Sequence, residues 1–246
     1  ISRALGADLS GDIRSPPGAV GAASFGFIVI VGARFAYAIE TSPLTATVAC
    51  LETLQRRWGG DAARGDDQAL VQVALRNSRN AAQLVRSLGD LALLDEPQFR
   101  LQPMKLDLAE ALDDIVMRFA DRACRQGVAL RHDADPAAQA IAAVDVELFE
   151  RAVANLVDNA LKFTPSGGCI TLRAEADDAS VRVRVADTGR GITPLDLEHL
   201  FDRLYTTGGE GGHGLGQAIV KRIVELHHGG VLVHSEPDRG TEPVIT

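Results

Sequence analysis

The apolar residues of this chain change their spacing partway along it, and that change limits the possible folds more than any other feature. Residues 70–91 place apolar side chains in steps of three and four, which predicts a long amphipathic helix. Residues 169–176, CITLRAEA, and 180–187, SVRVRVAD, instead alternate apolar and polar side chains, as half-buried strands do. The sequence therefore predicts a helical part followed by a part that contains a sheet.

The helical part is predicted to be a hairpin. Apolar residues recur at helical spacing from Pro43 to Trp58, and the turn-like stretch 59–67, GGDAARGDD, separates them from the second helix. Two helices cannot bury a wide apolar stripe alone, so we expect two chains to form a four-helix bundle, which makes the protein a homodimer. The predicted stripe of the second helix consists of Leu70, Val73, Ala74, Asn77, Ala81, Leu84, Val85, Leu88 and Leu91.

The second part is predicted to be an α+β sandwich. Its helices are expected at 108–125, 148–163 and 215–228, and a further strand at 231–236. This order of helices and hairpin-linked strands predicts helices on one face of a mixed, mostly antiparallel sheet. The predicted segments are the end of an upstream or membrane-proximal segment at 1–33, the helical hairpin at 34–95, a linker at 96–107 and the α+β domain at 108–246.

Composition narrows the choice of partners and compartment. The net charge of −8 argues against nucleic acid as a partner, because phosphate backbones require a basic face. Three cysteines without a CxxC pair argue against a disulfide framework or a zinc site and favour a reducing cytosol. The uncharged run 15–33 approaches the length of a membrane span, but two prolines and four glycines interrupt it. We interpret it as the edge of an upstream domain, with a membrane helix as the alternative.

The first chemical motif is 155–165, NLVDNALKFTP, within a predicted helix. Asn155 and Asn159 are four residues apart and so share one face, and Lys162 follows three residues later on the same side. Amide oxygens can ligate Mg²⁺, and an ammonium group can meet phosphate oxygens. Taken alone, this segment is equally compatible with a solvated helix face.

The second motif is 187–192, DTGRGI, directly after a predicted strand. The carboxylate of Asp187 can accept a hydrogen bond from an amine, and the two glycines allow the backbone to pass close to a flat ring. Adenine offers an exocyclic amine at that point, whereas guanine would present a carbonyl oxygen to the same carboxylate. Two facing acceptors are unfavourable, so the motif predicts a preference for adenine.

The third motif is a glycine-rich stretch, 208–216, that leads into a helix. Backbone N–H groups at the start of a helix, without Cβ atoms in the way, can hold phosphates. Residues 209–214 also fit the G-x-G-x-x-G fingerprint of dinucleotide-binding proteins. We reject that interpretation because no buried strand precedes it and no parallel βαβ unit surrounds it.

In this order and spacing, the three motifs resemble the ATP-binding domain of sensor histidine kinases, which shares its fold group with DNA gyrase, Hsp90 and MutL. The resemblance covers roughly residues 35–246 and includes an F box around 200–205, LFDRLY. It implies ATP and Mg²⁺ as cofactors, a homodimer, and a response regulator receiver domain as partner. It also implies a cytoplasmic domain, with attachment to the inner membrane through the upstream segment as an open alternative.

The resemblance assigns roles to individual residues. It makes Asn159 the Mg²⁺ ligand, with Asn155 and Lys162 as the catalytic pair near the phosphates, and it places Asp187 on the adenine amine. Residues 203–213 would form a mobile ATP lid, in which His213 is better interpreted as a solvent-facing residue than as a catalytic one. The remaining ATP contacts that it implies are Phe163, Gly189, Gly191, Ile192, Arg203, Tyr205, Thr206, Gly212, His213, Gly214, Leu215 and Gly216.

The histidine that carries the phosphate in this family is missing. The family pattern H-E-L-R-T-P-L is matched only by 42–45, SPLT, and the histidine position falls on Ala38 or, with one extra residue, on Tyr37. All six histidines lie at 132 or later. Alanine offers no nucleophile, and a phenol with a reference pKa near 10 needs activation. We therefore expect autophosphorylation on histidine to fail in this chain.

Several functions stay open on the sequence. The first is a sensor histidine kinase-like protein that binds ATP and Mg²⁺ and signals to a response regulator, and the second is a pseudokinase or regulatory homologue. Others are a kinase that uses Tyr37 or phosphorylates a partner subunit, and a conventional kinase whose histidine was replaced. An ATPase clamp of the gyrase–MutL type is disfavoured by the hairpin and by Asn155, where those enzymes place a general-base glutamate.

Overall fold

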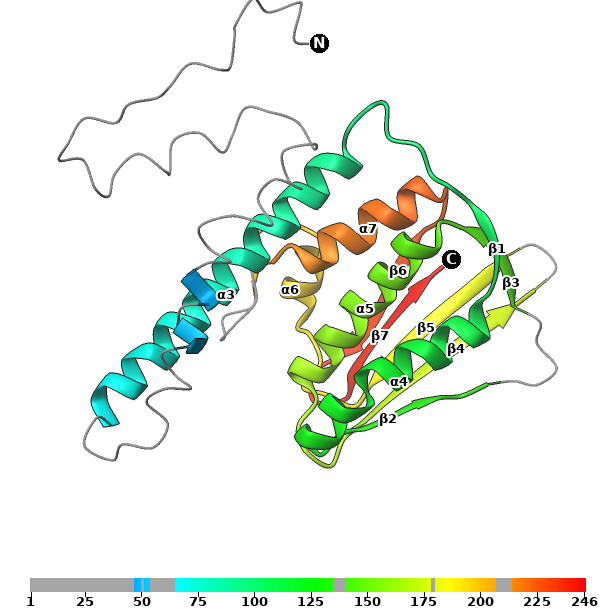
Figure 1. The fold of residues 1–246 in the computed structure, drawn as a ribbon. Helices are drawn as coiled ribbons and strands as arrows, with labels where there is room; N and C mark the ends of the chain where they lie inside the picture. Colours follow the sequence, from blue (N-terminus) through cyan, green and yellow to red (C-terminus); the bar gives the residue numbers. More distant parts are fainter. Residues whose placement is uncertain (1–46, 50, 54–64, 135–139, 178–179, 207–213) are drawn as a thin grey trace, which may run out of the picture.

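The computed structural model describes residues 47–49, 51–53, 65–134, 140–177, 180–206 and 214–246. A long helix packs against a sandwich of helices and strands (Figure 1). The elements, in chain order, are α3 (Gly65–Leu94), β1 (Met104–Asp107), α4 (Leu108–Gln126), β2 (Ala129–His132), β3 (Ile141–Val144), α5 (Val146–Phe163), β4 (Cys169–Ala176), β5 (Val181–Asp187), α6 (Pro194–Glu198), α7 (Gly216–Leu226), β6 (Val231–Glu236) and β7 (Gly240–Ile245).

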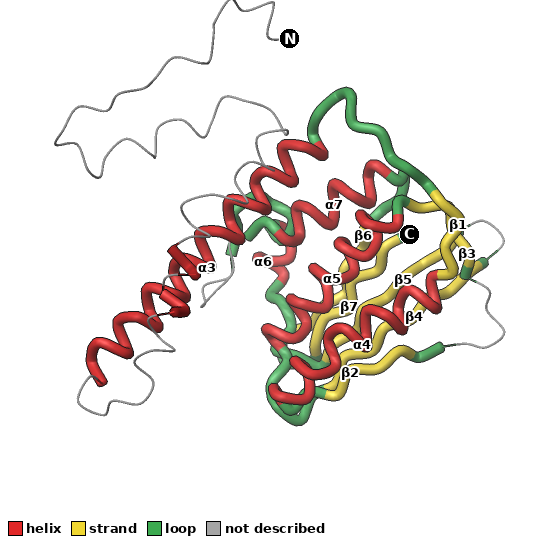
Figure 2. The backbone as a smooth tube through the Cα atoms, viewed as in Figure 1, coloured by secondary structure: helices red, strands yellow, loops and turns green. Residues whose placement is uncertain are grey.

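The sandwich has one helical layer and one five-stranded sheet, and β1 and β3 form a separate two-stranded sheet. The five-stranded sheet has the order β2-β4-β5-β7-β6, in which β2 and β4 are parallel and the other neighbours antiparallel. Helices α4, α5 and α7 cover one of its faces (Figure 2). This arrangement confirms the predicted α+β class with a mixed, mostly antiparallel sheet.

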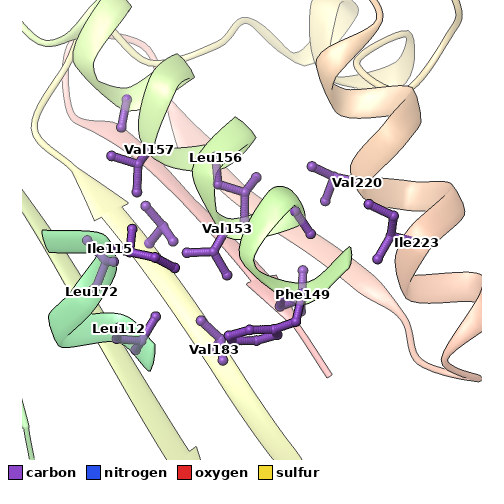
Figure 3. Packing of buried hydrophobic residues seen from close by; sticks show 14 of the residues in the cluster. Leu112, Ile115, Phe149, Val153, Leu156, Val157, Leu172, Val183, Val220 and Ile223 are labelled. Atoms are coloured by element: carbon purple, nitrogen blue, oxygen red, sulfur yellow. The ribbon is translucent and has the colours of Figure 1, made fainter. Parts of the chain in front are cut away.

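The core lies between the helical layer and the sheet. Figure 3 shows α5 at its centre, with Val153 and Val157 pointing toward side chains of α4 and of the strands. Both valines are fully buried, as are Leu112 of α4 and Leu172 of β4. The alternation predicted for 169–176 is visible as alternating burial along β4, so the period-two pattern has its expected cause.

Two helices of this layer begin at aspartate caps, and one does not. Asp107 accepts a hydrogen bond from the N–H of Ala109 (2.9 Å) at the start of α4, and Asp145 accepts one from Leu148 (3.3 Å) at the start of α5. Helix α7 begins after Leu215, which makes no side-chain cap. Its first backbone N–H groups are therefore not used by a capping side chain.

The predicted hairpin is described only in part. Helix α3 forms its second arm, and the helical residues 47–49 and 51–53 belong to the first. The two arms are in contact, because Arg79 pairs with Glu52 at 2.6 Å between Nη2 and Oε1. Tyr37 and Ala38 lie outside the described residues.

The burial along α3 adds residues to the predicted stripe, whose own burial was expected from a second chain. Leu70, Val73 and Leu88 are exposed, whereas Val71 and Leu75, which the stripe left out, are buried. A helix that packs on more than one neighbour carries apolar residues on more than one face, and a single stripe cannot represent this. Leu91 and Leu94, at the other end of α3, join the core cluster of the sandwich.

The segment predicted as a linker, 96–107, contains a strand. Residues of β1 pair antiparallel with β3, from Met104 opposite Val144 to Asp107 opposite Ile141. The sequence did not predict this short strand, because the segment contains two prolines, which are rare inside strands. No helix among the described residues has the length and apolar character needed to span a membrane, and the run 15–33 lies outside them.

Candidate nucleotide-binding site

A cavity of about 320 Å³ lies between α5, the strands β5, β6 and β7, and the first turn of α7. Five of the residues predicted to bind ATP line it, namely Asn159, Phe163, Asp187, Gly191 and Ile192. They come from α5, from the end of β5 and from the loop after it. The structure therefore brings the first two motifs together, and Gln217 of α7, the residue after the third motif, also lines the cavity.

Asp187 is held in one orientation at the end of β5. Its Oδ1 accepts hydrogen bonds from the N–H of Gly189 (2.8 Å) and from the N–H of Thr241 (3.3 Å). Burial raises the pKa of the Asp187 carboxyl, and these two bonds partly offset the rise. Among the contacts of the described residues, Oδ2 is the oxygen that is left for a ligand amine.

Cations border the cavity on the side of α5. The Nζ atom of Lys162 lies 4.8 Å from the centre of the Phe163 ring, and the guanidinium of Arg190 lies 4.5 Å from it. Burial, and then the positive charge of Arg190, lower the pKa of Lys162. A bound polyphosphate would neutralise this pair of cations. Arg190 lines the cavity, and the sequence analysis did not single it out, although it lies inside the second motif.

Two buried amide side chains lie where α5 faces the start of α7. Asn155 Nδ2 and Gln217 Oε1 are buried and have no hydrogen-bond partner among the described residues. A Cβ atom on Gly216 would lie 3.8 Å from Asn155 Oδ1, so the two helices are close at this point. Buried polar atoms without a partner are costly, which points to a bound group that would satisfy them. Gln217 was not predicted as a site residue. Its buried, unpartnered oxygen identifies it as a candidate, and the sequence does not show this burial.

The glycines are required by the fold itself. A Cβ atom at Gly189 would lie 2.6 Å from the carbonyl oxygen of Phe163, and one at Gly191 would lie 2.0 Å from that of Glu236. Gly191 and Gly214 also have φ values of 67° and 64°, which favour glycine. Their close contacts are with the protein's own backbone, in addition to any room that they leave for a ring.

The other predicted residues are placed differently. Leu215 is buried in the core, so only its backbone can serve a ligand. Arg203 pairs with Asp95, and the Tyr205 hydroxyl donates to Asp196 Oδ1 (2.8 Å). Thr206 is exposed, and none of these four lines the cavity. Gly212 and His213 lie outside the described residues.

The donor set at this site suits Mg²⁺ carried by a nucleotide. Asn155 and Asn159 are one turn apart on α5, and amide oxygens are hard ligands of the kind that Mg²⁺ prefers. In the described part of the chain, no group of three His, Cys, Asp or Glu side chains is arranged to hold a metal by itself. Mg²⁺ would therefore need phosphate oxygens and water to complete its coordination. The buried Nδ2 atom of Asn155, which has no partner among the described residues, is a donor and fits a phosphate oxygen or a metal-bound water.

This geometry agrees with the family to which the C-terminal part is similar. Residues 144–246 match the model of the histidine kinase-, DNA gyrase B- and HSP90-like ATPase family. The C-terminal part of the chain is thus an ATP-binding domain of the histidine kinase type, as the three motifs predicted.

The relatives found by sequence are sensor proteins. The chain is 34% identical over 215 residues to the sensor histidine kinase TmoS of Ectopseudomonas mendocina, which covers 85% of this chain and 22% of TmoS. It is 35% identical over 210 residues to the sensor protein DivL of Caulobacter vibrioides, covering 83% and 26%. Identity is 30% over 205 residues with the adaptive-response sensory kinase SasA of Synechococcus sp., covering 81% and 54%. The chain thus spans between about a fifth and about half of these relatives, and it is a homologue of sensor histidine kinases.

Solved structures show the same fold. Full-length ShkA in complex with AMPPNP superposes with a TM-score of 0.68 and 24% identity, over 87% of this chain and 45% of ShkA. The histidine kinase AdeS of Acinetobacter baumannii gives a TM-score of 0.60 and 20% identity, over 84% of this chain and 96% of AdeS.

Proposed function

We propose that this chain binds ATP with Mg²⁺ as the nucleotide-binding and dimerisation part of a sensor histidine kinase-like protein, which signals to a response regulator. One observation carries the proposal. The anchored carboxylate of Asp187, the amide of Asn159 and the start of α7 converge on one cavity. The family of the C-terminal part and the sensor relatives support the same function.

Each group has a task in nucleotide binding. Oδ2 of Asp187 accepts the N–H of the adenine amine, because Oδ1 is already occupied by two backbone donors. The uncapped N–H groups of α7 and the ammonium of Lys162 hold phosphate oxygens. The amide oxygen of Asn159 would hold Mg²⁺, which when bound neutralises phosphate charge, and the Nδ2 group of Asn155 would donate to a phosphate oxygen.

The experiment that tests ATP binding is calorimetric titration of the purified chain with ATP and MgCl₂. The proposal requires one saturable site per chain, with weaker binding of GTP. Asp187→Asn should lose the preference for adenine, and Asp121→Asn is the matched control, because Asp121 pairs with Arg125 on the exposed side of α4. Absence of saturable ATP binding by the folded wild-type chain would contradict the proposal.

The phosphate acceptor decides between a kinase and a pseudokinase. The family position of the histidine falls on Ala38 or Tyr37, so we propose that this chain does not phosphorylate itself on histidine. Incubation with γ-labelled ATP and Mg²⁺ separates the alternatives. Acid-stable label that disappears in Tyr37→Phe supports a tyrosine acceptor, and binding without label supports a regulatory homologue. Acid-labile label would contradict the alignment.

We also propose that α3 contributes to a homodimer and that the cytoplasm is the site of action. Leu70, Val73 and Leu88 are exposed apolar residues on α3, and a second hairpin would cover them. Sedimentation at micromolar concentration should give the mass of a dimer. The Leu88→Glu substitution should lower the measured mass toward that of a monomer. A monomeric wild-type chain would contradict the dimer. The receiver domain of a response regulator is the proposed partner. For the run 15–33, the edge of an upstream domain stays the preferred interpretation and a membrane helix the alternative.

A further inference from the structure

The end of α3 is joined to the nucleotide-binding fold by one shared carboxylate. Asp95 directly follows Leu94, the last residue of α3. Its Oδ2 atom accepts a hydrogen bond from Arg203 Nη2 at 2.6 Å, and its Oδ1 atom lies 3.0 Å from Arg222 Nε. Each carboxylate oxygen thus binds a different arginine. One of these arginines, Arg203, is a residue that the resemblance to histidine kinases assigned to ATP, and Asp95 holds it where it does not line the cavity.

Arg222 fixes the carboxylate in place. Its guanidinium donates two hydrogen bonds to the carbonyl oxygen of Leu94, at 3.2 Å and 3.0 Å. A cation is favourable there, because the last carbonyls of a helix carry partial negative charge. Leu94 itself is only 1% exposed and belongs to the common core. Asp95 is therefore held by a buried anchor and by α7, unlike an isolated surface carboxylate.

Arg203 belongs to a segment that borders the cavity. Leu200, three residues earlier, lines the cavity, and Tyr205, two residues later, binds Asp196, which also lines it. The N–H of Leu204 donates to the carbonyl of Gly214 at 3.0 Å, which ties this segment to the start of α7. Arg203 thus lies between the end of α3 and the helix start that holds phosphates in the proposed function.

We propose that Asp95 is a positioning residue for the nucleotide site, because its carboxylate competes with the phosphates of ATP for Arg203. ATP then binds more weakly while the end of α3 holds this arginine, and more tightly when the pair is broken. The affinity for ATP thereby becomes dependent on where α3 lies relative to α7. This inference rests on the proposed function, since it requires that the cavity binds ATP.

The test is the affinity for ATP·Mg²⁺ and for adenosine, measured by calorimetry on wild-type chain and Asp95→Asn. The Arg203 and Asp95 side chains are 61% and 36% exposed, so solvent screens the pair. We therefore expect ATP to bind about two- to fivefold more tightly to Asp95→Asn. Adenosine, which has no phosphate, should bind equally to both. In an Arg203→Gln background, Asp95→Asn should have no effect on ATP.

The matched control is Asp90→Asn. Asp90 lies five residues earlier, on α3, and pairs with Arg151 of α5 instead of Arg203. Asp90→Asn therefore removes the same charge without touching the Asp95–Arg203 pair. Unchanged or weaker ATP binding by Asp95→Asn, equal effects of Asp90→Asn, or an effect that persists without Arg203 would each overturn the inference. Asp95→Glu is the second variant, to be used if Asp95→Asn proves unstable. It retains the carboxylate, so it should bind ATP as the wild type does, and tighter ATP binding by Asp95→Glu would also overturn the inference. Loss of ATP binding by the wild-type chain would instead refute the proposed function.

Discussion

Replacement of Asp187 by asparagine separates the role of this residue in the ligand site from its role in the fold. The Oδ1 atom of Asp187 accepts from Gly189 and Thr241, and an asparagine must place its only oxygen there to keep both bonds. Its NH₂ group then occupies the place of Oδ2. That group faces the adenine amine as a second donor, so the acceptor for adenine is lost although the shape of the side chain is retained.

The size of the effect follows from the kind of bond that is lost. A hydrogen bond to a charged acceptor contributes about 1.5–3 kcal/mol. At about 1.4 kcal/mol per factor of ten, the dissociation constant of ATP should rise about 10- to 100-fold. The fold should not suffer, because burial raises the pKa of Asp187 and the neutral amide avoids the cost of a buried charge.

Calorimetric titration and thermal unfolding measure the two effects on the same samples. Asp187→Asn should bind ATP weakly, discriminate less against GTP, and unfold at or above the wild-type temperature. Asp121→Asn, on the exposed side of α4, should leave ATP affinity unchanged. A folded Asp187→Asn variant with wild-type ATP affinity would refute the reasoning.

Three further predictions concern pH, charge and packing. Because the pKa of Asp187 is raised, this carboxylate takes up a proton at a higher pH than an ordinary aspartate does. As pH is lowered, ATP affinity should therefore begin to fall at that higher pH. A calorimetric pH series that superposes on that of Asp187→Asn would contradict this. Lys162→Met should weaken ATP binding more than adenosine binding, since Lys162 is placed to meet phosphates, and equal losses would exclude that role. Leu112→Ala, fully buried on α4, should cost about 2–5 kcal/mol of unfolding free energy in urea titrations, with ATP affinity retained in the folded state, whereas a loss below about 1 kcal/mol would contradict its place in the core.

The raised pKa of Asp187 also determines how folding stability changes with pH. A carboxyl group whose pKa is higher in the folded state than in the unfolded state binds its proton more tightly when folded. Its contribution to stability is therefore complete below the unfolded pKa and is lost as pH rises through the folded pKa. Asp187 thus opposes folding at neutral pH, and the anchored carboxylate is retained there at a cost that nucleotide binding can offset.

The sequence predicted most of the fold because the periodic segments are long. The alternation in 169–176 and the apolar spacing in 148–163 both have a single physical cause, namely one face turned toward the core. The short strands β1, β2 and β3 were missed, since four residues are too few to show a period. The burial of Val71 and Leu75 was missed because it depends on what packs against α3.

The sequence predicted those site residues that belong to a recognisable motif. Asp187, Asn159 and Phe163 line one cavity, as the resemblance to histidine kinases implied. Gln217 could not be found in this way, since a glutamine at a helix start has many uses and only its buried, unpartnered oxygen marks it. The pairing of Arg203 with Asp95 joins residues 108 positions apart, and no local pattern contains it.

The most direct measurement of the central claim is an amide NMR titration of the chain with ATP and Mg²⁺. The account predicts that the largest saturable shifts occur together at Gly189, Ile192, Asn159 and Gly216, which come from distant parts of the sequence but surround one cavity. Asp187→Asn should require about 10- to 100-fold more ATP to produce the same shifts. Shifts confined to one of these segments, or none at saturating ATP, would show that the segments do not form a common nucleotide site.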